Sequence, residues 1–198
     1  MSFWKLAGRL AVVVALGVGL AGCGINKIPA QDQEVKARWS DVQNEYQRRA
    51  DLVPNLVATV KGYAKQEQTV FIQVTEARAK ATQTVLPADV LTNPQAFQAY
   101  ERSQAQLSGA LGRLLAVSEA YPDLKSNQNF IALQAQLEGT ENRITIARRD
   151  YIDAVQKFNT LLVTIPYRWT AAIFYPELKP YQTFQTSEKN QSAPTVQF

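Results

Sequence analysis

The feature that most constrains the fold is a seven-residue repeat of apolar side chains in the first half of the chain. Its members alternate steps of three and four residues, and polar Arg49 and Glu67 fill two of the positions. The apolar members are Val35, Trp39, Val42, Tyr46, Val53, Leu56, Val60, Tyr63, Val70, Val74, Ala77 and Ala81. This spacing is typical of a long helix packed along its length against other helices. We therefore predict a helix from near Gln31 or Asp32 to about Thr84.

Pro54 is the one disruption of this repeat. Proline has no N–H, and its ring clashes with the carbonyl four residues earlier, here that of Ala50. The helix could continue with a kink, with Asn55 and Asn142 satisfying the freed backbone groups. It could also stop and restart, with Asp51 as N-cap and Pro54 in the first turn. Because the repeat keeps its phase through Pro54, we favour the kinked continuous helix.

Two more long helices are predicted. One covers about 94–120, with Asn93 as N-cap and Pro94 in its first turn. The other begins within 123–127, reaches about Thr164 and carries a second seven-residue row. This row is Phe130, Leu137, Ile144, Tyr151, Phe158 and Ile165. Three long helices with short loops predict an all-α antiparallel bundle, which becomes effectively a four-helix bundle if the kink at Pro54 divides the first helix.

Aromatic side chains are expected mainly in the core. Those on the repeats are Trp39, Tyr63, Tyr100, Tyr151 and Phe158. A second aromatic group is crowded into 167–184, where we predict a short helix near 168–174 and then an extended segment. This group either caps the end of the bundle or presents a surface to a membrane or partner. The polar stretch 186–198 is expected to be a disordered tail.

The N-terminus has the pattern of an export signal. Lys5 and Arg9 precede an apolar run over 10–20, and small residues follow. A charged region, a short apolar region and a small-residue region make a secretory signal peptide. The run is shorter than the roughly 20 apolar residues of a spanning helix. We therefore assign 1–22 to a signal peptide and 23–30 to a tether.

The end of this signal resembles the bacterial lipobox. Leu20-Ala21-Gly22 precedes Cys23, the single cysteine of the chain. The resemblance implies cleavage before Cys23 and attachment of several acyl chains, which would anchor the protein stably in a membrane. The alternatives are a chance cysteine after an ordinary signal peptide, or an N-terminal anchor that is never cut. With glycine at position 24, the pattern implies a cell-envelope lipoprotein, placed in a Gram-negative host at the outer membrane facing the periplasm.

Composition removes several function classes. The chain has no histidine, which excludes histidine-based triads and metal sites. A carboxylate-only metal site could use Glu67, Glu76, Glu119 or Glu141, but we interpret these as solvated or ion-paired. Loss of 1–22 removes two basic residues and lowers the net charge from +4 to +2, which argues against nucleic-acid binding. We predict no enzyme, catalytic residue, metal or cofactor.

The candidate interaction site consists of Pro54 and of charged and polar side chains near it and in the third helix. They are Arg48, Arg49, Asp51, Pro54 and Asn55, with Glu141, Asn142, Arg143, Arg148, Arg149 and Asp150. In an antiparallel pair these two segments could lie at one level and form an ion-pair network. The network would either dock a partner or an anionic headgroup, or fix the register between helices. We favour the register role, because exposed ion pairs contribute only about 0–1 kcal/mol each.

Three sequence blocks resemble the LemA family. They are Arg49–Val57 (RADLVPNLV), Tyr121–Lys125 (YPDLK) and Thr140–Ile144 (TENRI). The resemblance spans roughly 35–185 and implies a helical bundle, here 31–185, held at a membrane, with no established catalytic residue. The chain departs from the family in two respects. It has a lipobox where many members keep a transmembrane helix, and it lacks the Tyr-Asn pairs that members usually carry late in the third helix. We predict a scaffold that binds protein partners or itself; the alternative is a bundle that senses a small ligand or lipid.

Overall fold

The architecture comes from a computed structural model, which describes residues 25–83 and 87–184. The predicted signal peptide, Cys23 and the predicted tail lie outside these ranges. The elements are α2 (Lys27–Tyr63), α3 (Gln68–Gln83), α4 (Pro94–Val117), the 3-10 helix η1 (Ser118–Ala120), α5 (Pro122–Lys125), α6 (Gln128–Val163) and α7 (Tyr167–Phe174). All the regular secondary structure in the described ranges is helical, which confirms the predicted all-α bundle.

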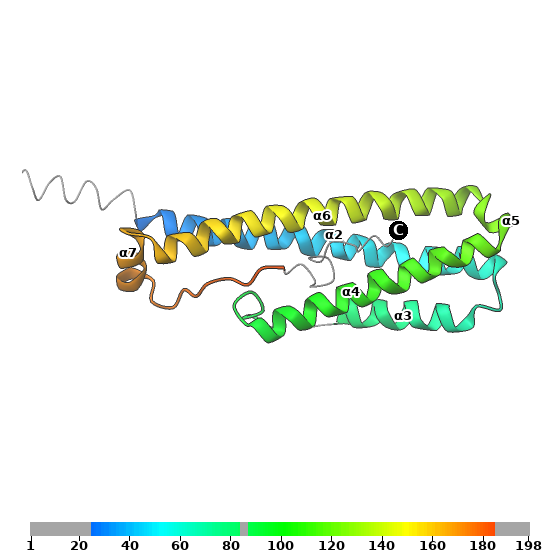
Figure 1. Cartoon of the computed structure of the whole chain (residues 1–198), viewed down its shortest axis with the longest axis horizontal. Coiled ribbons are helices and arrows are strands. Elements are labelled where there is room, and N and C mark those ends of the chain that lie inside the picture. Colours follow the sequence, from blue (N-terminus) through cyan, green and yellow to red (C-terminus); the bar gives the residue numbers. More distant parts are fainter. Residues whose placement is uncertain (1–24, 84–86, 185–198) are drawn as a thin grey trace, which may run out of the picture.

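Two long antiparallel helices run along the length of the molecule. Helices α2 and α6 run side by side, and α3 and α4 form a second pair along one part of them (Figure 1). Helix α6 has 36 residues and is therefore about 54 Å long. Helix α7 lies at the end of the α2–α6 pair where α2 begins, away from α3. The chain then continues as an extended segment over 175–184. The result is an elongated bundle.

The predicted first helix is divided, but not at Pro54. Helix α2 begins at Lys27, earlier than the expected Gln31 or Asp32, so the predicted tether is partly helical. It continues through Pro54, as predicted, and then ends at Tyr63. Helix α3 folds back through a turn over 64–67, so the single helix to Thr84 was wrong. A helix continuing past Tyr63 would extend beyond its partner α6, whereas the reversal buries the apolar face of α3 against α4 and α2.

The backbone group freed by Pro54 finds a partner on another helix. The Nε of Arg78, on α3, donates to the Ala50 carbonyl at 2.8 Å. This is the carbonyl that would accept from residue 54 in an uninterrupted helix. Arg78 therefore supplies the missing donor, rather than Asn55 or Asn142, which are both exposed. The proline and the helix hairpin are thus coupled.

The predicted start of the second long helix is confirmed, and α6 begins at Gln128, one residue after the predicted range of 123–127. The Asn93 Oδ1 accepts from the backbone N–H groups of Gln95 and Ala96 at 3.1 and 3.2 Å, with Pro94 in the first turn of α4. The Asn127 Oδ1 accepts from the Phe130 N–H at 3.1 Å and caps α6. Both caps satisfy backbone donors that the first turn of a helix leaves without partners.

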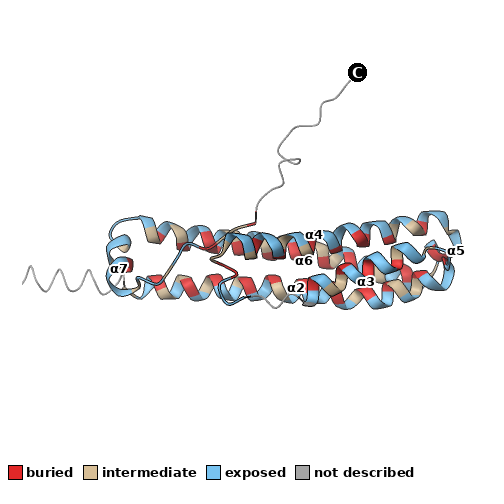
Figure 2. Cartoon of the chain, turned by 90° about the horizontal axis from the view of Figure 1, so that it is seen from below, coloured by how far each residue is buried: buried red, intermediate tan, exposed pale blue. Residues whose placement is uncertain are grey.

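The interior consists of two hydrophobic clusters. Buried residues recur along each of the long helices (Figure 2). The first cluster is rich in aromatic residues: Trp39, Tyr46, Phe97, Tyr100, Tyr151, Phe158, Tyr181 and Phe184. The second is mainly aliphatic and includes Val53, Leu56, Leu107, Leu114, Leu124 and Leu137. Tyr63 is 43% exposed, so its predicted core position was wrong. The aromatic segment is only partly in the core, because Tyr181 and Phe184 are buried there while Trp169 is exposed. Its contact with a membrane or partner stays a prediction.

Candidate functional site

A layer of buried polar side chains lies between the two hydrophobic clusters. Arg49 of α2, Gln104 of α4 and Thr140 of α6 are 1%, 5% and 1% exposed. Along each helix, the core residue about one turn before the layer residue and the core residue about one turn after it belong to different clusters. A buried polar group costs free energy unless it is hydrogen-bonded. The bonding of this layer therefore decides whether it is structural or is available to a ligand.

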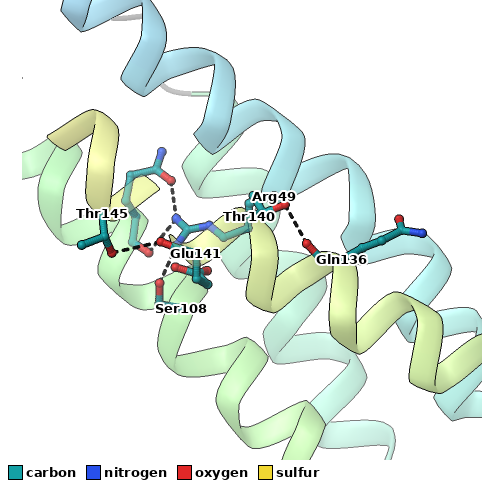
Figure 3. A network of polar contacts seen from close by, with 7 residues as sticks. Arg49, Ser108, Gln136, Thr140, Glu141 and Thr145 are labelled. Atoms are coloured by element: carbon teal, nitrogen blue, oxygen red, sulfur yellow. Dashed lines mark hydrogen bonds and ion pairs between the residues drawn. The ribbon is translucent and has the colours of Figure 1, made fainter. Parts of the chain in front are cut away.

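Arg49 is the centre of the layer (Figure 3). Its Nη1 donates to the Ser108 Oγ at 2.5 Å and to the Glu141 Oε1 at 3.2 Å. Its Nη2 donates to the backbone carbonyl and the side-chain Oε1 of Gln104 at 3.2 and 2.8 Å. The guanidinium also lies 4.9 Å from the ring centre of Tyr46. One side chain thus ties α2 to both α4 and α6.

The charge balance of the layer is asymmetric. Arg49 is buried, whereas the side chain of its counter-ion Glu141 is 41% exposed. The Nε of Arg49 is buried without a hydrogen-bond partner. Gln104 extends the network to a third neighbour, because its Nε2 donates to the Ala81 carbonyl of α3 at 3.2 Å. The layer therefore joins all four helical segments of the bundle.

Ion pairs on the outside of the bundle continue the same register. The Arg143 Nε lies 3.1 Å from the Glu45 Oε2, and the Arg148 Nη2 lies 3.5 Å from the Glu101 Oε1. Together with Arg49–Glu141, these pairs connect α6 to α2 and α4. The structure thus brings the two predicted segments to one level. The remaining predicted residues pair within their own helices or are exposed: Arg48 with Glu45, Arg149 with Asp150, Asp51 with Gln47, and exposed Pro54, Asn55 and Asn142.

A small cavity adjoins the polar layer. Its volume is about 130 Å³, and its lining includes Gln43, Gln47, Thr82 and Gln104. Small-molecule sites usually occupy about 300–1,000 Å³ and are mostly apolar. A polar cavity of this size suits a few water molecules, each of which occupies about 30 Å³ in the liquid. The residues near Pro54 therefore leave little room for an organic ligand.

A second set of polar contacts fixes the extended segment 175–184. The Asn159 Nδ2 donates to the Tyr181 carbonyl and its Oδ1 accepts from the Tyr181 N–H, both at 2.9 Å. The Tyr151 hydroxyl donates to the Gln182 carbonyl at 2.8 Å. The Tyr181 hydroxyl donates to the buried Asp32 Oδ1 at 2.5 Å. Burial, and then Asp32, raises the pKa of Tyr181.

Two open grooves run along the outside of the bundle. The groove between α3 and α4 has a volume of about 520 Å³, and its charged lining is Glu76, Lys80, Arg102 and Arg113. The groove between α2 and α6 has about 290 Å³, and its charged lining is Asp41, Glu45, Arg143 and Asp150. The first groove has a basic excess and the second an acidic one.

Two features are absent from residues 25–83 and 87–184, namely a metal-ligand cluster and a membrane-spanning helix. In these ranges, no three histidine, cysteine, aspartate or glutamate side chains are grouped as metal ligands would be. No helix in the same ranges is both long and apolar enough to cross a bilayer. Three of the candidate carboxylates have other partners. Glu141 pairs with Arg49, Glu119 pairs with Lys125, and Glu67 accepts from the Tyr121 hydroxyl.

Sequence reasoning missed several residues that hold these contacts. Gln104 was detectable, because it occupies a position in the apolar row that includes Tyr100 and Leu107, as Arg49 does in its own row. Arg78 and Asn159 carried no comparable signal. Their partners are backbone carbonyls whose position depends on the tertiary fold.

The fold and these contacts define a class: an elongated helical bundle whose buried polar side chains bond neighbouring helices to one another. The family model described as LemA family matches residues 38–198. The chain belongs to the LemA family.

The curated relatives, which include a protein named LemA, are similar to this chain at low sequence identity. Two proteins of Paramagnetospirillum magneticum, Magnetosome protein MamQ 1 and MamQ 2, are each 24% identical over 75% of this chain and 60% of their own length. Protein LemA of Metamycoplasma hominis is 23% identical over 82% of this chain and 69% of its own length. The chain thus spans about 60% of the length of the magnetosome relatives.

Proposed function

We propose that this protein is a lipid-anchored cell-envelope scaffold that binds other proteins, or copies of itself, or organises a region of membrane, and that it is not an enzyme. One observation carries the proposal. The buried polar side chains of the bundle hold its helices together, and two open grooves run along its outside. Such a molecule offers surfaces rather than an enclosed site.

Membrane association is supported by the sequence and by the relatives. The N-terminal signal and the lipobox resemblance at Cys23 supply the anchor. Three relatives carry the word magnetosome in their names, which supports a membrane setting for this branch of the family. Because the chain spans only part of those relatives, their particular assembly is not transferred to it.

The scaffold role is supported by the charges of the grooves. The α3–α4 groove offers Arg102 and Arg113, which are both exposed, and the α2–α6 groove offers exposed Asp41. Complementary charges steer proteins toward one another and fix their orientation. The grooves could therefore receive charged partners, or could join neighbouring copies of the chain. A ligand-sensing bundle is less well supported, because the cavity beside the polar layer is small and polar.

Anchoring is tested by Cys23→Ser. The proposal expects this variant to lose palmitate labelling, to keep its signal peptide and to leave the lipoprotein fraction. Unchanged labelling and processing would show that Cys23 is not the anchor.

Scaffolding is tested by purification of the full chain from envelope membranes after chemical cross-linking in intact cells. We expect specific proteins or cross-linked copies of the chain to be recovered. Recovery of the monomer alone, in the presence of efficient cross-linking of a known envelope complex, would contradict the scaffold. This result is separate from the outcome for Cys23.

A further inference from the structure

One end of the bundle carries an exposed apolar surface, which we call the α7 tip. It consists of Val163, Ile165, Trp169, Ile173 and Phe174, each of which is more than half exposed. The other exposed large apolar residues of the described chain, Tyr63, Ile72, Ile131 and Ile146, are spread over α2, α3 and α6. Large apolar side chains gathered at one place on a surface usually mark an interaction site.

Helix α7 is apolar on two opposite faces. Tyr167, Ala171 and Tyr175, four residues apart, pack against the aromatic core. Trp169 and Ile173 follow the same four-residue spacing on the outside and remain uncovered by the described chain, as does Ile165 in the turn before α7. Burial of the inner face therefore explains why α7 docks on the bundle, but leaves the outer face without a role in the fold.

The α7 tip lies at the end where the chain enters the bundle. The Lys27 Nζ lies 3.5 Å from the Tyr167 hydroxyl and 5.0 Å from its ring centre, so the first turn of α2 contacts α7 (Figure 1). Lys27 lies only four positions after Cys23, a distance of at most about 14 Å for an extended chain. An acyl anchor on Cys23, or an uncut apolar segment over 10–20, would therefore bring the tip to the bilayer surface.

The side chains around the tip suit a membrane interface. Lys27, Arg168 and Lys179 are exposed there, against one exposed acidic residue, Glu177. Basic side chains near a membrane are attracted to anionic headgroups, and tryptophan is enriched at the level of the headgroups. A short helix with apolar residues facing outward and basic residues beside them binds at this depth.

We propose that the α7 tip inserts into the headgroup region of an anionic bilayer and acts as a second membrane contact beside the N-terminal anchor. This inference rests on the membrane anchoring in the proposed function. Two contacts at one end would hold the bundle upright, because the start of α6 lies about 54 Å from its end at the tip. Upright bundles would present both grooves to neighbouring proteins rather than to lipid.

The test uses the full mature chain reconstituted in phosphatidylglycerol-containing vesicles whose acyl chains are brominated near the headgroup. Bromine quenches tryptophan fluorescence on contact, and the difference between wild type and Trp169→Phe isolates Trp169. The matched control is Ile131→Trp in the Trp169→Phe background, which puts a tryptophan at an exposed apolar position near the far end of α6. Flotation of the vesicles reports anchoring separately, and circular dichroism confirms that each variant folds.

We expect the chain to float, Trp169 to lose most of its fluorescence and the Ile131→Trp signal to remain. A floating chain in which Trp169 is unquenched would overturn the tip contact and leave the anchoring intact. Cross-linking of unquenched Trp169 to a second copy would assign the tip to self-association instead. Equal quenching at both positions would also overturn the inference, since it indicates a bundle that lies flat. A chain that fails to float contradicts the anchoring, and the tip contact with it.

Discussion

Arg49 shows how a functional-looking residue serves the fold. Its position within the RADLVPNLV block and its charge made it a candidate for docking a partner. In the structure its guanidinium is 1% exposed and bonds to Ser108, Gln104 and Glu141. A buried arginine with bonds to two other helices fixes the level at which those helices meet, because a shifted helix would leave its charge unpaired.

Replacement of Arg49 by lysine should be costly. An ammonium group cannot reproduce the forked contacts of the guanidinium to α4 and α6. We expect Arg49→Lys to lower the free energy of unfolding by about 2–4 kcal/mol, measured by urea denaturation. The control is Arg48→Lys, whose side chain is 61% exposed, with an expected change within about 0.5 kcal/mol. Equal effects at the two positions would refute the role given to Arg49.

Buried tyrosines predict a limit to stability at alkaline pH. Burial raises the pKa values of Tyr46, Tyr100, Tyr151 and Tyr181 above the usual 10.0. Above about pH 10 the unfolded chain loses phenolic protons that the folded chain retains, so the free energy of unfolding falls as pH rises. The melting temperature should therefore decrease steadily from about pH 10 upward. A constant melting temperature up to about pH 11 would contradict the burial of these hydroxyls.

At the scale of elements, Pro54 and the α2–α3 hairpin depend on each other. The proline leaves the Ala50 carbonyl without its helical donor, and Arg78 of α3 donates a hydrogen bond to it. We expect Arg78→Gln to cost about 1–1.5 kcal/mol in the wild type and less than half as much in a Pro54→Ala background, where the N–H at position 54 can bond to Ala50. A double-mutant cycle by urea denaturation measures this coupling.

Arg102→Gln is the matched control for this cycle. Arg102 is exposed and its Nε donates to the Gln98 carbonyl within its own helix at 3.3 Å. It should show no coupling to Pro54→Ala. If the cost of Arg78→Gln is unchanged by Pro54→Ala, the compensation for the proline lies elsewhere.

The extended segment 175–184 should depend on Asn159. Loss of its two bonds to the Tyr181 backbone should cost about 1–3 kcal/mol and expose the segment locally. We therefore expect Asn159→Ala to speed hydrogen exchange of the Tyr181 N–H and proteolysis within 175–184. Asn142→Ala, at an exposed position on the same helix, should change neither. Unchanged protection in Asn159→Ala would show that the other contacts of the segment, such as Tyr151 with Gln182 and Tyr181 with Asp32, hold it without Asn159.

The elements were largely predictable and the connections between them were not. Periodicity and caps located α4 and α6, since Asn93, Pro94 and Asn127 are strong local signals. The turn over 64–67 left no such signal, because its sequence AKQE consists of good helix formers and the apolar repeat continues across it. Its position follows from where α6 begins opposite the end of α2, which is a property of the tertiary fold. The register residue Arg49 was named in advance, while its partners on α4 depended on how the helices pack.

At the scale of the whole molecule, the bundle is polarised along its length and around its sides. The exposed apolar tip and the start of α2 lie at one end. The grooves along the sides have a basic excess between α3 and α4 and an acidic excess between α2 and α6. On the proposed anchoring, this arrangement would hold the bundle at a membrane and leave its sides for partners.

Cross-linking in intact cells tests the scaffold most directly when it is combined with charge reversal in one groove. The full chain should give cross-linked species that disappear in the double variant Arg102→Glu and Arg113→Glu, at two exposed residues of the α3–α4 groove. The double variant Lys61→Glu and Lys65→Glu makes the same charge change at exposed positions outside both grooves and should leave the species intact. Both variants should unfold like the wild type. If the cross-linked species survive reversal of the groove, or are lost equally in both variants, this groove is not where the protein assembles.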